Sequence, residues 1–201
     1  GLLVSYRYKK QEYIHNGQGP RPFFWRAPTD NDYGAKFPVR LKAWKEASYQ
    51  EPKAESFNVV RDKDTTAVKV TYRFPQTDAR WDITYKVYGN GVIKVDNHFV
   101  AENAQTPMIP RVGLRMQLPA RITSLTYYGR GPKENYRDRR TSQFIGEYTS
   151  GIQDMYEPYV RPQENNHRTD IYWCTLTSKA KEGLLFVADR TFEMNVSNYP
   201  L

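Results

Sequence analysis

The sequence predicts an all-β protein, a large antiparallel β-sandwich with one short helix. From Glu55 onward, β-branched and aromatic runs of sheet length follow one another and are separated by turns. Helical spacing of apolar residues appears near residues 39–49. Aromatic residues make up 14% of the chain and include 16 Tyr, so each can bury a large area in a core. We find no internal repeat or linker and therefore expect a single domain over residues 1–201.

Composition narrows the functional classes. A chain of 201 residues can build one domain with a hydrophobic core, and its single cysteine, Cys174, excludes an internal disulfide framework. No window approaches the apolar length of a membrane span, and no basic-then-apolar leader opens the chain. We expect no membrane partner, and the sequence leaves the compartment open.

The formal net charge of +8 raises the question of a polyanionic partner. Lys and Arg are interleaved with acids along the chain, and Arg137–Arg140 is the densest basic stretch. Nucleic-acid binders usually concentrate positive charge on one face or one helix. We therefore expect a solvated surface and no nucleic-acid partner, and a basic interaction module remains an alternative hypothesis.

The N-terminal part predicts a hairpin followed by a segment that enters the core. Residues 2–8 alternate as a strand does, and residues 12–15 could pair with them. A turn follows at residues 16–20, which read Asn-Gly-Gln-Gly-Pro. The run Phe23–Gly34 places three large aromatic residues before a polar Asp-Asn-Asp stretch, so we expect it to enter the core and re-emerge at a polar edge.

A helix is predicted over about Val39–Tyr49. Leu41, Trp44 and Ser48 recur at helical spacing with Lys and Glu between them, and Pro38 suits the first turn.

The strands are predicted from alternation and residue type. We expect four at 56–61, 67–74, 80–88 and 92–100, with a tight hairpin at Gly89-Asn90-Gly91, where positive φ is needed. Two more are expected at 111–118 and 122–128, then a loop-rich region at 129–168, and finally strands at 170–177, 184–190 and 192–197. Because the sequence stops soon after a good strand, we expect the domain to continue past Leu201 and to be truncated at its C-terminal end.

Three polar runs are the candidate sites, and the first is Arg26–Asp32. Asp30 and Asp32 could form a carboxylate pair or bind a hard cation, because such cations prefer oxygen ligands. The further acids of a calcium loop are missing, so turn formation and capping are the alternative.

The second run is Tyr127–Arg139. Gly129 and Gly131 flank Arg130, and Glu134, Asn135 and Arg139 follow, but the phosphate-binding pattern lacks its third glycine. An Arg–carboxylate network that locks a loop and a saccharide-binding surface use the same residue types, so both interpretations stay open.

The third run is Tyr156–Arg168. Pro158 and Pro162 stiffen it, and its amide, carboxylate and guanidinium groups form the most site-like loop of the chain. Its candidate residues are Arg161, Gln163, Glu164 and Asn165. A long polar loop without a ligand is the alternative.

Other catalytic chemistries lack their motifs. The histidines 15, 98 and 167 are scattered without zinc spacing, and Cys174 lies on a predicted strand between Trp173 and Thr175, which favours packing. Glycoside hydrolysis needs two facing carboxylates, and the sequence alone does not show that Glu134 and Glu164 face each other.

Taken together, four segments resemble successive motifs of the small-chain, C-terminal domain of family-two glycoside hydrolases, the β-galactosidases. The segments are FFWRAPTDNDYG, IPRVGLRMQLP, YYGRGPKENYRDR and YVRPQENNHR, in the order in which the family has them. The resemblance covers nearly the whole chain. Asn166-His167 departs from the pattern, because the family commonly has Gly at the first of these positions.

The resemblance implies a supersandwich like galactose mutarotase, at the C-terminal end of a multidomain enzyme. That enzyme would hydrolyse terminal β-D-galactosides with retention, using two Glu residues on a separate barrel, Mg²⁺ and a possible Na⁺. The other domains and the galactoside would be partners of this chain, and the parent would be a homo-oligomer in the cytoplasm or periplasm.

Under this resemblance the chain itself carries no catalytic residue, binds no metal and is inactive alone. An independent sugar-binding or mutarotase-like module is the alternative. The residues expected to face carbohydrate are Trp25, Arg26, Asp30, Asn31, Asp32, Arg130, Glu134, Asn135, Arg139, Arg161, Gln163, Glu164 and Asn165.

Overall fold

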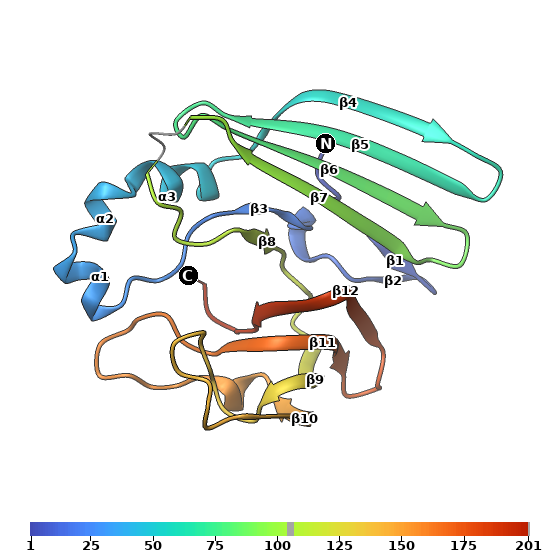
Figure 1. The fold of residues 1–201 in the computed structure, drawn as a ribbon. Helices are drawn as coiled ribbons and strands as arrows, with labels where there is room; N and C mark the ends of the chain where they lie inside the picture. Colours follow the sequence, from blue (N-terminus) through green and yellow to red (C-terminus); the bar gives the residue numbers. More distant parts are fainter. Residues whose placement is uncertain (104–106, 201) are drawn as a thin grey trace. The chain divides into compact units, whose positions relative to one another are not determined.

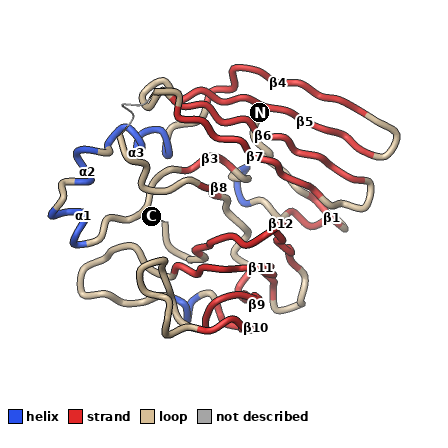
Figure 2. The backbone as a smooth tube through the Cα atoms, viewed as in Figure 1, coloured by secondary structure: helices blue, strands red, loops and turns tan. Residues whose placement is uncertain are grey.

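The computed structural model describes residues 1–103 and 107–200 and confirms the all-β, antiparallel prediction (Figures 1 and 2). The chain forms two compact units. Unit 1 comprises Gly1–Arg26 and Asn31–Gln117, and unit 2 comprises Ala27–Asp30 and residues 118–200. The assignment of residues 1–201 to one domain remains a prediction.

Unit 1 is built on a four-stranded antiparallel sheet in chain order, visible in Figure 1. Its strands are β4(Lys53–Arg61), β5(Thr65–Phe74), β6(Ala79–Tyr88) and β7(Ile93–Ala101). The predicted hairpin between β6 and β7 is confirmed, because Val87 pairs with Ile93 and Gly91 takes a φ of +90°. The N–H of Gly91 donates to the carbonyl of Tyr88 at 3.0 Å and closes the turn.

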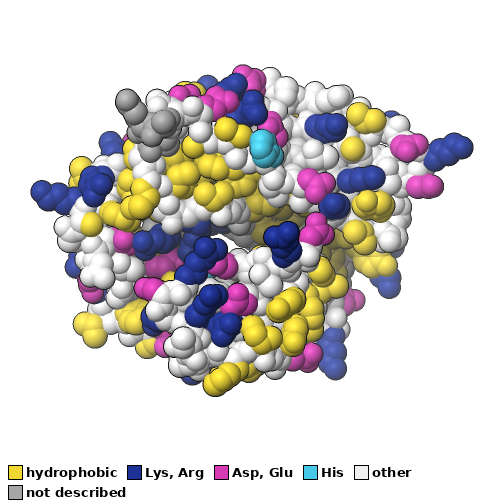
Figure 3. All heavy atoms as spheres, viewed as in Figure 1, with side chains coloured by type: hydrophobic (Ala, Val, Ile, Leu, Met, Phe, Trp, Pro, Cys, Tyr) yellow, Lys and Arg dark blue, Asp and Glu magenta, His cyan; other side chains and the backbone are white. Residues whose placement is uncertain are grey.

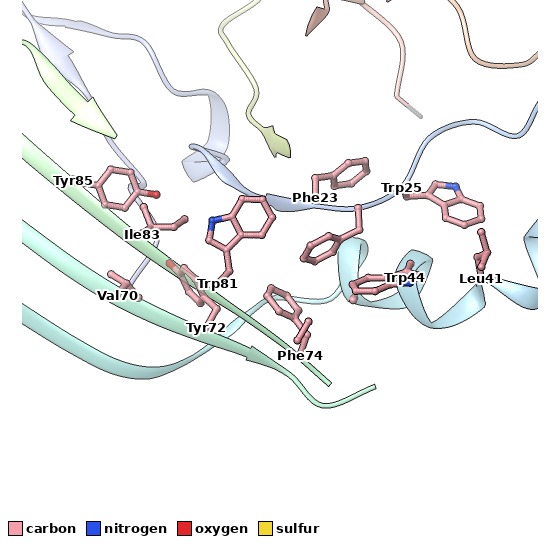
Figure 4. Packing of buried hydrophobic residues seen from close by; sticks show 13 residues of the cluster. Phe23, Trp25, Leu41, Trp44, Val70, Tyr72, Phe74, Trp81, Ile83 and Tyr85 are labelled. Atoms are coloured by element: carbon pink, nitrogen blue, oxygen red, sulfur yellow. The ribbon is translucent and has the colours of Figure 1, made fainter. Parts of the chain in front are cut away.

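One face of this sheet carries the core of unit 1. Alternate side chains of β5 and β6 are buried, as the pattern of period two requires. Phe24 is fully buried, and its ring centroid lies 4.9 Å from that of Trp44, 5.0 Å from Phe74 and 5.5 Å from Trp81. Figure 4 shows Phe23, Trp25 and Trp44 on the side of the sheet toward which Trp81 and Phe74 point. The expectation that the aromatic run enters the core is therefore confirmed.

The helical region differs from the single helix predicted at 39–49. It consists of α1(Asp30–Gly34), α2(Phe37–Arg40) and α3(Lys42–Tyr49). Leu41 breaks the expected helix, because its ψ of 21° is not helical and its side chain is almost fully buried. Trp44 and Ser48 lie on the buried face of α3 as predicted. The Ser48 hydroxyl accepts the N–H of Phe24 at 2.9 Å and so ties α3 to the aromatic run.

The N-terminal strands are shorter than predicted. β1(Arg7–Tyr8) pairs with β2(Gln11–Glu12), and η1(His15–Gly17) follows. The Glu12 carboxylate accepts the backbone N–H groups of Tyr6, Tyr13 and Ile14 at 2.9, 3.1 and 2.9 Å. The Glu12 side chain therefore takes the place of backbone acceptors that a longer strand ladder would supply.

The strand predicted at 111–118 is confined to β8(Gly113–Arg115), which pairs with β3(Arg21–Phe23).

Unit 2 contains a second antiparallel sheet in the order β10-β9-β11-β12. Its strands are β9(Ile122–Gly131), β10(Phe144–Gly151), β11(His167–Ser178) and β12(Gly183–Asn195), and η2(Gln153–Met155) lies between β10 and β11. β10 corrects the loop-rich prediction for 129–168. The strands predicted at 184–190 and 192–197 are one strand, whose pairing with β11 shifts between Val187 and Phe192.

The core of unit 2 lies on one face of this sheet. Leu125, Tyr127, Ile171 and Cys174 are buried there. Burial raises the pKa of the Cys174 thiol to about 12, so the thiol is a packing group and not a nucleophile.

Charged side chains are mixed in sign on the face shown in Figure 3, where Lys and Arg lie among Asp and Glu. This arrangement agrees with the interleaved charges of the sequence. Within residues 1–103 and 107–200, none of the helices has the length and apolarity that a membrane-crossing helix requires.

Candidate functional site

Three polar segments meet in unit 2. The Glu164 carboxylate accepts the N–H of Ala27 at 3.3 Å, and Arg161 pairs with Asp30 at 3.2 Å. The loop after β9 joins them, because the N–H of Asn135 donates to the carbonyl of His167 at 2.8 Å. We call the side chains gathered here the polar cluster: Glu134, Tyr136, Arg139, Tyr159, Glu164, Asn166, His167, Glu193 and Asn195.

Glu134 is a carboxylate of the polar cluster, and its side chain is almost fully buried. One carboxylate oxygen accepts hydrogen bonds from Arg139 and from the hydroxyl of Tyr159. The other accepts the N–H of Asn166 at 2.7 Å. Burial and the hydrogen bond to Glu134 raise the pKa of Tyr159, which keeps its hydroxyl protonated as a donor. Glu134 thus fixes the loop before β11.

An aromatic and cationic stack lies beside Glu134. The guanidinium of Arg139 lies 4.5 Å from the ring centroid of Tyr136, and Tyr136 stacks on the imidazole of His167 at 5.1 Å. Burial raises the pKa of Tyr136. The side chain of Arg139 is 53% exposed, so this end of the stack reaches solvent.

His167 ties the loop to β12. Its Nδ1 lies 2.8 Å from Oδ1 of Asn195, and its Nε2 lies 3.0 Å from a carboxylate oxygen of Glu193. The amide of Asn195 also donates to Glu164 at 2.9 Å and to the carbonyl of Asn165 at 2.8 Å. Burial acts to raise the pKa of Glu193, but hydrogen bonds from Arg137 and His167 outweigh it and lower that pKa.

Arg130 and Asn135 hold the backbone of the second polar run. Arg130 pairs with Asp170 at 2.7 Å, and Arg140 approaches the same carboxylate at 3.2 Å. Asn135 is fully buried, and its amide donates to the carbonyls of Arg130 and Lys133. For these two residues the structure shows the loop-locking network that the sequence left open as one of two interpretations.

In unit 1, the candidate residues also make internal contacts. Trp25 is 4% exposed and belongs to the core. Arg26 holds Asp32 with two hydrogen bonds, at 2.5 and 2.8 Å. Asp30, which belongs to unit 2, pairs with Arg161. Asn31 is exposed, and its carbonyl accepts the N–H of Ala35 at 2.9 Å.

The surface-accessible candidates are fewer. The side chains of Asp30 and Arg161 are 63% and 56% exposed. Gln163 and Asn165 are half-buried, and the Asn165 amide donates to the carbonyl of Gln163 at 3.3 Å. The side chains of Trp25 and Asn135 are buried, so each can affect ligand binding only by positioning the backbone around it.

Two buried polar atoms of the polar cluster have no hydrogen-bond partner among the residues that the structure describes. They are the hydroxyl of Tyr136 and Oδ1 of Asn166. Asn166 has a φ of 65° and is 2% exposed, and its amide donates to the carbonyl of Val196. Asn adopts this left-handed conformation more readily than most residues.

Within residues 1–103 and 107–200, no group of three or more His, Cys, Asp or Glu side chains is placed to hold a metal ion.

Sequence reasoning missed several members of the polar cluster. Tyr136, Glu193 and Asn195 were not singled out, and His167 was set aside as a scattered histidine. The signal that unites them is the pairing of His167 with Asn195 across β11 and β12. Because the pairing of β11 with β12 is irregular, this register cannot be predicted from the sequence of either strand alone.

Comparison with known proteins identifies the family. The profile described as "Beta galactosidase small chain" matches residues 1–201. A β-galactosidase of Priestia megaterium is 34% identical over 199 residues, which are 99% of this chain and 19% of that protein. A β-galactosidase of Lactobacillus delbrueckii subsp. bulgaricus is 35% identical over 202 residues, 100% of this chain and 19% of that protein.

A third relative, the β-galactosidase of Streptococcus thermophilus, is 32% identical over 197 residues, 96% of this chain and 19% of that protein. The chain thus spans about a fifth of the length of the relatives that it matches. It belongs to the β-galactosidase small-chain family.

Proposed function

We propose that this chain is the non-catalytic C-terminal domain of a family-two β-galactosidase that hydrolyses terminal β-D-galactosides with retention. The family match and the small share of each relative that the chain covers support this proposal. The observation that carries the non-catalytic role is the engagement of Glu134 and Glu164. Glu134 accepts from Arg139, Tyr159 and Asn166, and Glu164 accepts from Asn195 and Ala27.

A glycosidase acid or nucleophile must be able to approach the glycosidic bond. Carboxylates that already satisfy buried donors would have to break those bonds before they could react. In the proposed parent, the two catalytic Glu residues, Mg²⁺ and any Na⁺ lie on the separate barrel. The other domains and the galactoside are then the partners of this chain, and the parent is a homo-oligomer.

The proposed contribution of this chain is to support the substrate pocket. Exposed charged groups of Asp30, Arg139 and Arg161 can hydrogen-bond sugar hydroxyls, and the free Asn166 Oδ1 and Tyr136 hydroxyl could each be satisfied by a hydroxyl group or a water molecule. The buried network behind them would hold the loops at fixed positions, which lowers the ordering cost of binding.

The test compares the complete polypeptide of the gene with the 201-residue chain. We expect β-galactosidase activity with a chromogenic galactoside and with lactose for the complete polypeptide, and none for the 201-residue chain. Turnover by the chain alone would overturn its non-catalytic role, and a complete polypeptide without galactosidase activity would overturn the assignment of the parent.

Calorimetry separates the alternative modules. An independent sugar-binding or mutarotase-like module should give saturable heat when the 201-residue chain is titrated with galactose or lactose. A basic interaction module should bind DNA or RNA with an affinity that falls steeply with salt. We expect neither result.

A further inference from the structure

The four-stranded sheet of unit 2 carries an apolar row of side chains on each of its two faces. In an antiparallel pair, residues directly opposite each other share a face. One row is Tyr127, Cys174 and Phe186, which belong to the core. The neighbouring row, on the opposite face, is Tyr128, Trp173 and Val187. An antiparallel sheet with one solvated face usually places polar residues on that face, as it does here at Thr126 and Thr175. The row of Tyr128, Trp173 and Val187 departs from this rule.

We call the apolar side chains of the second face the outer patch: Tyr128, Tyr172, Trp173, Leu185 and Val187. Tyr128 and Tyr172 are 39% and 44% exposed, and Leu185 and Val187 are 62% and 67% exposed. The rings of Tyr128 and Tyr172 contact each other, with centroids 5.3 Å apart. Contiguous exposed apolar groups of this size mark an interaction surface more often than solvent-facing sheet.

The outer patch has a polar border on one side. Glu147 of β10 lies opposite Tyr128, and Thr149 lies opposite Thr126. The hydroxyls of Thr126 and Thr149 are 2.9 Å apart and satisfy each other. An apolar centre with a polar margin is the usual anatomy of a protein interface.

We propose that the outer patch is the surface on which another part of the same β-galactosidase polypeptide packs. This inference rests on the proposed function, because it takes the remaining four-fifths of the relatives' length as the source of the covering segment. The covering segment presents an apolar surface with polar groups at its edge, opposite Glu147. It makes the sheet of unit 2 an internal layer of the parent protein.

A saccharide fits the outer patch less well. Its two most exposed members, Leu185 and Val187, carry no hydrogen-bonding side-chain group. A sugar placed over them would lose hydrogen bonds to water without replacement, which costs free energy. A protein segment with apolar side chains has no such cost.

Hydroxyl-radical footprinting tests the proposal. Oxidation of Tyr128, Tyr172 and Trp173 is measured by mass spectrometry in the 201-residue chain and in the complete polypeptide. We expect a several-fold lower oxidation rate in the complete polypeptide, and a similar rate in both for the exposed Tyr8 of unit 1 as a reference.

Substitution gives a second readout. The double variant Leu185→Thr/Val187→Thr places at both positions a β-branched residue that suits a strand, but it removes apolar contact area. We expect its urea midpoint to be unchanged in the 201-residue chain and lowered in the complete polypeptide. Lys69→Thr, at an exposed position of β5, is the matched control and should change neither midpoint.

Several outcomes would overturn the proposal. Equal oxidation in the two proteins would show that nothing covers the patch, and full protection in the 201-residue chain would show that this chain covers it. Protection that appears only with added lactose would assign the patch to a saccharide, and protection that rises with protein concentration would assign it to a second copy. If the complete polypeptide has galactosidase activity but its outer patch stays exposed, this inference is wrong and the proposed function stands. If the outer patch is covered but the complete polypeptide has no galactosidase activity, the proposed function is wrong.

Discussion

The carboxylate of Glu134 accepts the backbone N–H of Asn166 at 2.7 Å, across 32 residues of chain. The donor belongs to a residue with a φ of 65°, so the carboxylate binds the loop where its backbone is left-handed. The other oxygen of Glu134 is held by Arg139 and Tyr159. One buried side chain therefore joins the loop after β9 to the loop before β11.

Glu134→Gln should destabilise the protein by about 2 kcal/mol, because charge-assisted hydrogen bonds to Arg139 and Tyr159 are replaced by weaker neutral ones. The amide would also direct two donors toward a site built for an acceptor. The free energy of unfolding is measured by urea denaturation. Glu147→Gln, at an exposed position of β10, is the control and should change it by less than about 0.5 kcal/mol. Equal effects of the two substitutions would contradict the anchoring role of Glu134.

Asn166 is expected to tolerate Gly better than Ala. Its left-handed φ costs an ordinary L-residue roughly 1 kcal/mol and costs Gly almost nothing. Both substitutions remove the amide contact to the Val196 carbonyl, so the comparison between them isolates the backbone term. We expect Asn166→Ala to be less stable than Asn166→Gly by about 1 kcal/mol in urea denaturation. If Ala were as stable as Gly, the turn would not need the left-handed conformation.

Glu12 should contribute a stability term that depends on acid pH. The hydrogen bond from Ser5, together with backbone donors, lowers the pKa of this carboxyl to about 2 from an ordinary value of 4.5. The ionised carboxylate is the form that the fold stabilises, so the contribution is complete above pH 4.5 and is lost as the pH falls toward 2. The difference in unfolding free energy between the wild type and Glu12→Gln should therefore shrink over this window. A difference that stays constant from pH 6 down to about 2 would rule out the linkage.

Much of the fold was predictable because β-branched and aromatic alternation is a local signal. The hairpin at Gly89-Asn90-Gly91 also follows from local rules, since its turn needs positive φ. β10 was missed because Phe144–Gly151 mixes two glycines with polar residues and half of its residues are exposed. The helix was predicted without its break, because Leu41 leaves helical geometry to reach the core, which is a tertiary effect.

The candidate site was predicted in outline only. The polar runs were visible in the sequence, but the partners of their charges depend on contacts between distant residues. Asp30 and Asp32 are two residues apart and yet bind Arg161 and Arg26 respectively. The role of His167 depends on its pairing with Asn195 across two strands whose register shifts. Sequence spacing does not encode such pairings.

Arg26 and Asp32 should be more sensitive to conservative substitution than an exposed ion pair of the same chemistry. Their side chains are 24% and 9% exposed, and two hydrogen bonds join them. Arg26→Lys keeps the charge but loses the planar two-point contact, so we expect a loss of about 1–2 kcal/mol in unfolding free energy. Arg137→Lys is the matched control, because Arg137 pairs with Glu193 but is 83% exposed, and its substitution should cost much less than that of Arg26. Urea denaturation monitored by tryptophan fluorescence measures both, and similar costs for the two variants would show that burial does not strengthen the Arg26–Asp32 contact.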